Sequence, residues 1–107
     1  MTINYGSRAA TPWGEAQAEE FIADGITLYS TASHGGMRLS AERLAAMPAL
    51  YRKTSPLNKA TTSYCPEPWF EEDCEVALVI CAFPESFRPE EVEAARRDFD
   101  YWYALPA

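Results

Sequence analysis

The apolar stretch VALVICAF, residues 76–83, limits the possible folds of this chain more than any other feature. A continuous apolar run leaves few positions that can face water, so this segment belongs in the core. Its composition suits a buried strand. However, the acids at 71–73 follow Pro68 as a helix amino terminus prefers, and the length also favours a helix. The sequence therefore predicts a central, mostly buried helix over about 71–83, with a buried strand as the alternative.

The beginning of the chain shows signals for one helix. Residues 1–10 have no clear periodicity and are expected to form an arm or an edge strand. A helix is predicted over about 12–23, because Thr11 can cap it and Pro12 suits its first turn. Gly25 fits the left-handed position just beyond the end of such a helix.

Residues 26–39 are predicted to form an antiparallel β-hairpin. β-Branched and aromatic residues alternate with others along ITLYSTAS, as in a strand with two different faces. His34, Gly35 and Gly36 follow, and glycine tolerates the positive φ angles of tight turns. The glycines are therefore expected to make the turn, and residues 37–39 to return as a short second strand.

Two more helices are predicted on either side of a long irregular connection. Ser40 can cap a helix over AERLAAM, which Pro48 ends or extends by one turn only. Residues 48–68 are polar and punctuated by proline, which is typical of irregular structure. The last helix begins at Pro89 and carries one apolar face at spacings of three and four residues. The residues of that face are Val92, Ala95, Phe99 and Trp102.

Together these elements predict one α+β domain over residues 1–107, with a short antiparallel hairpin or sheet packed with three or four helices. The hydrophobic fraction of 48% is too high for a disordered segment. No apolar run approaches the roughly 20 residues that a membrane span needs, and the amino terminus lacks the apolar core of a signal peptide. A cytoplasmic location without membrane contact is therefore expected.

Cysteines and acids give no pattern of a metal or cofactor site. Cys65, Cys74 and Cys81 form no CxxC pair, so neither a disulfide framework nor a zinc site is indicated, and buried thiols are expected. No phosphate-binding loop or dinucleotide motif is present. We predict no metal and no cofactor.

Acidic side chains are concentrated in the second part of the chain. The net charge is −7, yet residues 1–65 hold five acids and six bases, whereas residues 66–107 hold eleven acids and three bases. A negative field repels phosphate backbones, so it disfavours direct nucleic-acid binding and favours a basic protein partner. A DNA-contacting protein is the weaker alternative, because nearby acids balance the bases that it would use. These bases are Arg38, Arg43, Arg52, Lys53 and Lys59.

The acids of the last two predicted helices are the candidate partner-binding residues. We expect them to form one extended negative face, comparable to a phosphate lattice, that binds a basic groove of a nucleic-acid-handling protein. Aromatic residues 101–103 either anchor that partner or pack in the core. The alternative is that the acids are only the solvated faces of two helices. The acids are Glu71, Glu72, Asp73, Glu75, Glu90, Glu91, Glu93, Asp98 and Asp100.

The segment STASHGGMRLS, residues 30–40, surrounds the only histidine with hydroxyl groups and glycines. A nucleophilic site needs a hydroxyl or thiol beside a base. Ser33 adjoins His34 on a strand and would point to the opposite face, whereas Thr31 or Ser30 can meet His34 across the turn, although no fixed spacing requires it. We assign no catalytic residue, and the alternative is a small enzyme or ligand-binding domain centred on His34, Thr31 and Ser33. The motif or pocket residues are Ser30, Thr31, His34, Gly35, Gly36 and Ser40.

Three motifs, TPWGEAQ, DGITLYSTASHGGMRLS and WFEEDCEVALVICAFPESF, together resemble a domain of unknown function carried by proteins of phages, plasmids and other mobile elements. The resemblance covers roughly residues 11–88. It places the residues of the second motif with those of the third, either in a shared pocket or in a contact that holds the hairpin against the central helix. The third-motif residues concerned are Glu71, Glu72, Asp73 and Cys74.

The resemblance implies a mobile-element context and no particular reaction. Small proteins of mobile elements often counter host defences, so by analogy the chain is expected to inhibit a CRISPR or restriction complex. The leading expectation is a non-enzymatic, acidic protein-binding module whose partner is a host protein or complex that handles nucleic acid.

Overall fold

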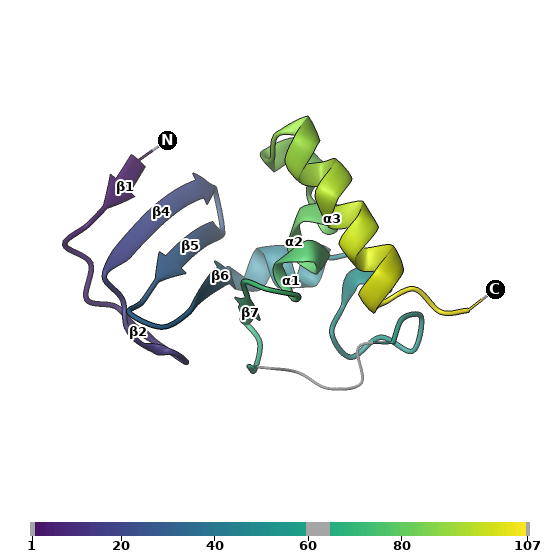
Figure 1. The fold of residues 1–107 in the computed structure, drawn as a ribbon, viewed down its shortest axis with the longest axis horizontal. Helices are drawn as coiled ribbons and strands as arrows, with labels where there is room; N and C mark the ends of the chain where they lie inside the picture. The colour runs from purple at the N-terminus through teal and green to yellow at the C-terminus, as the bar shows by residue number, and fades with distance from the viewer. Residues whose placement is uncertain (1, 60–64, 107) are drawn as a thin grey trace.

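The computed structural model describes residues 2–59 and 65–106 of the chain. Within them the chain forms a five-stranded antiparallel sheet, a separate two-stranded hairpin and three α-helices, so the predicted α+β class is confirmed (Figure 1). The strand order in the sheet is β1-β4-β5-β6-β7. The strands are β1 (Thr2–Asn4), β2 (Ala10–Thr11), β3 (Gly14–Glu15), β4 (Ala18–Ala23), β5 (Ile26–Ser30), β6 (Gly35–Leu39) and β7 (Trp69–Glu71). The α-helices are α1 (Ala41–Ala46), α2 (Val76–Ala82) and α3 (Pro89–Trp102), with 3-10 turns η1 (Ala49–Tyr51) and η2 (Pro84–Ser86).

The helix predicted over 12–23 is wrong, because this segment forms the β2–β3 hairpin and the strand β4. Strand β4 pairs with β1 on one side and β5 on the other, and these long-range backbone hydrogen bonds override the local helix signals. The hydroxyl of Thr11 makes a turn in place of a cap, since it accepts from the N–H of Trp13 and donates to the carbonyl of Gly14. Gly14 itself has a φ of 118°, and Gly25, with a φ of 80°, lies in the turn between β4 and β5.

The β5–β6 hairpin is confirmed, but its turn lies before the glycines. The hydroxyl of Thr31 donates to the carbonyl of His34 at 2.7 Å and accepts from the N–H of His34 at 3.1 Å. Gly35 and Gly36 belong to strand β6 and have no positive φ angle. They lack side chains because of close packing: a methyl group on Gly35 would lie 2.6 Å from the carbonyl oxygen of Tyr29.

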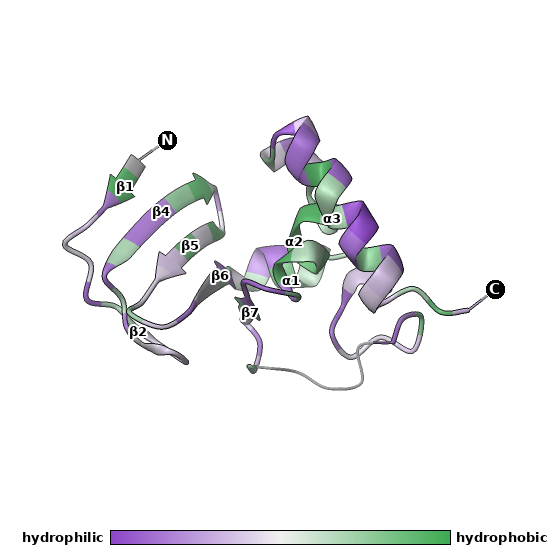
Figure 2. Ribbon diagram, viewed as in Figure 1, coloured by the Kyte–Doolittle hydropathy of each residue, from purple (hydrophilic) through white to green (hydrophobic). Residues whose placement is uncertain are grey.

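The segment predicted as a helix over 71–83 contains a strand and a helix. Strand β7 pairs with β6, and α2 begins only at Val76. The central helix is therefore confirmed, and its residues Ala77–Cys81 are buried. Its predicted start was wrong because the acids that resemble a helix amino terminus lie in β7 and the loop after it. Figure 2 shows that α2 is coloured mostly as hydrophobic, whereas α3 alternates between hydrophobic and hydrophilic residues.

The other predicted elements agree with the structure, except for the exposed position of Trp102 and for the short helical turn within residues 48–68. Strand β1 is an edge strand, and Ser40 caps α1 by accepting the N–H of Arg43 at 3.1 Å. Helix α3 begins at Pro89 as predicted, but Trp102 is 51% exposed and does not belong to the buried face. The connection 48–68 also contains η1 and the approach to β7, and residues 60–64 within it lie outside the described part.

The sheet is buried on one face against the helices. Ile26 lies opposite Leu39, and Met37 lies opposite Phe70, so these residues share a face and form a core with α2 and α3. The other face carries an aromatic cluster of Trp13, Tyr29 and Trp69, which the β2–β3 hairpin completes. None of the described helices is long and apolar enough to cross a membrane.

Candidate functional site

A pocket of about 330 Å³ lies where segments from all three sequence motifs meet. The hairpin β2–β3 contributes Trp13, the turn between β5 and β6 contributes His34, and the end of β7 with the loop after it contributes Glu71, Asp73 and Cys74. The sequence left open whether the second and third motifs share a pocket or only a packing contact. The structure brings His34 together with Glu71, Asp73 and Cys74 around one cavity.

Trp13 is held on the sheet by close contact with Gly36. A methyl group on Gly36 would collide with the carbonyl oxygen of Phe70 and with the indole ring of Trp13. The Trp13 ring also meets the Trp69 ring edge to face, with centroids 5.7 Å apart and an interplanar angle of 87°. The absent side chain at position 36 therefore lets the indole reach the wall of the pocket.

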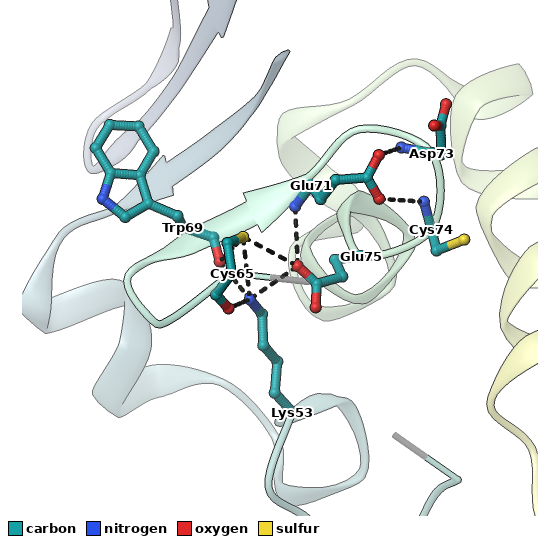
Figure 3. Close-up of polar contacts among 7 residues, drawn as sticks. All are labelled: Lys53, Cys65, Trp69, Glu71, Asp73, Cys74 and Glu75. Atoms are coloured by element: carbon teal, nitrogen blue, oxygen red, sulfur yellow. Dashed lines mark hydrogen bonds and ion pairs between the residues drawn. The ribbon is translucent and has the colours of Figure 1, made fainter. Parts of the chain in front are cut away.

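The loop between β7 and α2 is organised around the carboxylate of Glu71. This carboxylate accepts the N–H of Asp73 at 2.7 Å and the N–H of Cys74 at 3.4 Å (Figure 3). Glu71 is only 7% exposed. Burial raises the pKa of the Glu71 carboxyl, and the charge of Asp73 raises it too, against the lowering effect of the two N–H donors.

A second buried glutamate, Glu75, forms an ion pair with a lysine. Glu75 is 2% exposed and its carboxylate lies 2.9 Å from the ammonium of Lys53, which is 5% exposed (Figure 3). The same oxygen accepts the N–H of Glu71 at 3.0 Å and the thiol of Cys65 at 3.2 Å. Lys53 also donates to the carbonyl oxygens of Cys65 and Trp69. These bonds fix β7 to the loop that carries Lys53.

The ionisation of this network follows from its contacts. Burial acts to raise the pKa of Glu75, but hydrogen bonds from the backbone of Glu71, from Lys53 and from Cys65 hold that pKa below its ordinary value. Burial, with the adjacent Glu75, raises the pKa of the Cys65 thiol to about 11. Glu75 is therefore a carboxylate at neutral pH, and Cys65 is a thiol.

The electrostatic environment of Cys74 is negative. Burial raises the pKa of its thiol, and the charges of Glu71, Asp73, Glu75 and Asp98 raise it further. No cationic group contributes to this shift among the described residues. A thiolate, the reactive form of cysteine, is therefore disfavoured at this position. The negative potential at the pocket instead favours a positively charged occupant.

Two of the predicted partner-binding acids do not reach the surface. Glu71 and Glu75 are buried, so the prediction that they face outward is wrong, because their carboxylates serve hydrogen bonds inside the fold. Glu71 nevertheless lines the pocket.

The other predicted acids are exposed or half-buried, in two settings. Arg88 contacts Glu90 at 3.4 Å and Glu91 at 3.1 Å, and Arg97 contacts Glu93 at 3.0 Å. These arginines interrupt the continuous negative face that was expected along the last helix. The remaining acids are exposed and form no ion pair within the described part of the chain. They are Glu72, Asp73, Asp98 and Asp100.

The predicted motif residues divide between the two ends of the β5–β6 hairpin. Thr31 and His34 lie at its turn, beside the pocket, whereas Ser40 lies at the far end and caps α1. The Thr31 hydroxyl is engaged with the backbone of His34, and within the described chain the imidazole has no hydrogen bond to Ser33 or Thr31.

Sequence reasoning missed Trp13 as a pocket residue, because it placed that residue on a helix. The signal that could have found it is the TPWG segment itself, in which a threonine and a glycine three residues apart suit a tight turn.

Three of the bases considered for DNA contact are used inside the fold. Lys53 is buried with Glu75. Arg52 donates to the carbonyl oxygens of Met47 at 3.1 Å and Ala45 at 3.0 Å, beside the end of α1. Arg43 donates to the carbonyl of Asp24 at 2.7 Å. These contacts weaken the nucleic-acid alternative further.

The described residues contain no group of three or more histidine, cysteine or acidic side chains placed to hold a metal ion. In comparisons with known proteins, residues 6–105 match a family model described as a domain of unknown function, DUF7007. No curated protein and no solved structure matches the chain.

Proposed function

We propose, from the premise that the chain belongs to the DUF7007 family, that it is a non-enzymatic module that binds a basic surface of another protein. The observation that carries this proposal is the negative environment of the pocket. Glu71 and Asp73 line it, Asp98 adds to its potential at Cys74, and no described base forms an ion pair with any of the three. A cationic surface is the complement of such a site.

The arrangement of the pocket favours binding over catalysis. A nucleophile needs a low pKa or an adjacent base. The Cys74 thiol has a raised pKa, and the Thr31 hydroxyl donates its proton to a backbone carbonyl. These groups therefore lack the activation that nucleophilic catalysis requires.

For the partner, we propose a host protein or complex that handles nucleic acid, because such proteins present basic grooves. The motifs that resemble mobile-element proteins support a role as an inhibitor of host defence, of the anti-CRISPR or anti-restriction kind, in the cytoplasm. Mimicry of a nucleic acid is the less favoured route, since Arg88 and Arg97 interrupt the row of acids on α3.

The test is capture from a host lysate, with two variants that change the net charge equally. Asp73→Lys with Asp98→Lys removes one acid that lines the pocket and one whose charge acts on Cys74 there, whereas Glu42→Lys with Glu85→Lys removes exposed acids elsewhere. We expect the wild type and the second variant to retain the same basic nucleic-acid-handling protein, identified by mass spectrometry, and the pocket variant to lose it. Equal retention by all three proteins would contradict the proposal.

A second candidate function is supported by the position of His34. His34 lines the same pocket as Cys74, Glu71 and Asp73, so a small-molecule ligand or a reaction centred on His34 is the alternative. Replacing His34 with alanine should then abolish ligand binding or turnover at unchanged thermal stability. An effect on stability alone would show that His34 is structural.

A further inference from the structure

We infer that the pocket formed by Trp13, His34, Glu71, Asp73 and Cys74 receives the guanidinium group of one arginine side chain from the partner. This inference rests on the proposed function and names the group that would enter the site. Two buried glutamates, Glu71 and Glu75, carry the argument, because among the described residues only Glu75 forms an ion pair with a lysine or arginine.

Glu75 and Glu71 differ in their ionic partners. Glu75 is neutralised by Lys53 at 2.9 Å inside the fold. Glu71 is also more than nine-tenths buried, yet its carboxyl group interacts only with backbone N–H groups and with the side chain of Asp73, another acid, and no described lysine or arginine forms an ion pair with it. A buried carboxylate without a cation is costly. A cation that enters the pocket would supply the partner that Glu71 lacks.

The cavity fits one side chain. Its volume of about 330 Å³ lies near the lower end of the range for ligand pockets, about 300–1,000 Å³. Such a space is too small for a peptide segment but sufficient for the end of a long side chain. The exposed acids Glu72 and Asp73, which follow Glu71 in the sequence, would face the polar groups of the partner that surround the entering side chain.

The lining favours arginine over lysine. Trp13, an aromatic residue, lines the same cavity as the acids Glu71 and Asp73. A planar guanidinium can stack on an indole while its N–H groups bind carboxylates in pairs. Each Glu71 oxygen accepts one backbone N–H, and a carboxylate oxygen has capacity for a second donor. A lysine ammonium would pair with the negative charge of the carboxylates, but it lacks the planar shape with which a guanidinium stacks on the indole.

The test is a titration of the full chain with three short peptides that differ only in the central residue. The peptides are acetyl-Gly-Gly-Xaa-Gly-Gly-amide with arginine, lysine or citrulline as Xaa, and the readout is the NMR shift of the Trp13 indole N–H. Citrulline keeps the shape of arginine and lacks the charge. We expect the arginine peptide to bind, the lysine peptide to bind at least about fivefold more weakly, and the citrulline peptide not to bind.

Two glutamine variants locate the binding. Glu71→Gln should weaken the arginine peptide by about tenfold or more, whereas Glu93→Gln, at an exposed acid of α3, should leave it unchanged. Circular dichroism and the melting temperature of Glu71→Gln verify that the fold is retained. Equal binding of the arginine and citrulline peptides, equal binding of the arginine and lysine peptides, or an unaffected Glu71→Gln variant would each overturn the inference.

The inference and the proposed function can fail separately. If the pocket variant Asp73→Lys with Asp98→Lys loses the captured partner while the arginine peptide does not bind, the proposed function stands and the inference is wrong. If the capture is insensitive to both charge reversals, the proposed function fails, whatever the peptides do.

Discussion

At the scale of single residues, the two buried glutamates are the central feature of this molecule. Glu75 is held by Lys53, Cys65 and the backbone of Glu71, and Glu71 is held by two N–H groups of the loop that follows it. The sequence shows both as members of an acidic run, EEDCE, and nothing in that run separates buried from exposed acids. The partner of Glu75 lies 22 residues away, so only the fold could identify it.

Removing the cation of the buried pair should destabilise the protein strongly. Lys53→Met leaves the carboxylate of Glu75 buried without its ammonium, which typically costs about 3–5 kcal/mol. The double variant Lys53→Met with Glu75→Leu removes both charges and should recover at least half of that loss. Urea unfolding measures both values. A loss below about 1 kcal/mol in the single variant would show that the pair contributes little.

The two glutamates should affect stability in opposite directions as the pH changes. The pKa of Glu75 is lowered in the fold, so its contribution is present above its ordinary pKa of 4.5 and is lost as the pH falls through the lowered value. The pKa of Glu71 is raised in the fold, so its native carboxyl holds its proton more tightly than the unfolded one does. Its contribution is therefore lost as the pH rises through 4.5 and the raised value.

This difference predicts the behaviour of Glu71→Gln. Relative to the wild type, the variant should gain stability as the pH rises from about 4 to about 7, because it cannot ionise. Unfolding free energies at several pH values measure the difference. A difference that is constant over this range would mean that the carboxyl of Glu71 ionises as readily in the fold as in the unfolded chain.

At the scale of elements, local sequence signals predicted the helices and strands that depend mainly on interactions between nearby residues. The sequence correctly predicts the cap of α1 at Ser40, the start of α3 at Pro89 and the strand β5 from its alternation, because caps, prolines and periodicity act within a few residues. The segment 12–23 was misread, since its conformation depends on pairing with β1 and β5. The pocket could be predicted only in part, because Trp13 reaches it through this hairpin.

The packing of Trp13 on strand β6 gives a prediction for Gly36. Gly36→Ala places a methyl group against the carbonyl of Phe70, which the sheet holds in place, and against the Trp13 ring. Such overpacking costs about 1–3 kcal/mol and should displace the indole from the pocket. Urea unfolding and near-ultraviolet circular dichroism measure the two effects. The matched control is Gly6→Ala, whose methyl group would have ordinary contacts and should change stability by less than about 0.5 kcal/mol.

At the scale of the whole molecule, the net charge of −7 is distributed differently from the simplest expectation. The acids do not form one continuous row on α3, since arginines accompany three of them. Within the described part of the chain, the acids without an ion pair include Glu71 and Asp73, which line a pocket built from three separate segments. The charge favours a cationic partner, and the pocket is the place where we propose that such a partner binds.

The central claim, that this pocket binds a cationic surface, is tested most directly by the affinity of the captured partner at two salt concentrations. Titration calorimetry with the wild type should show binding that weakens at least tenfold between about 0.05 M and about 0.5 M salt. Asp73→Lys with Asp98→Lys should abolish binding at both concentrations, whereas Glu42→Lys with Glu85→Lys should retain most of it. Affinity that depends on neither salt nor the pocket acids would contradict the claim.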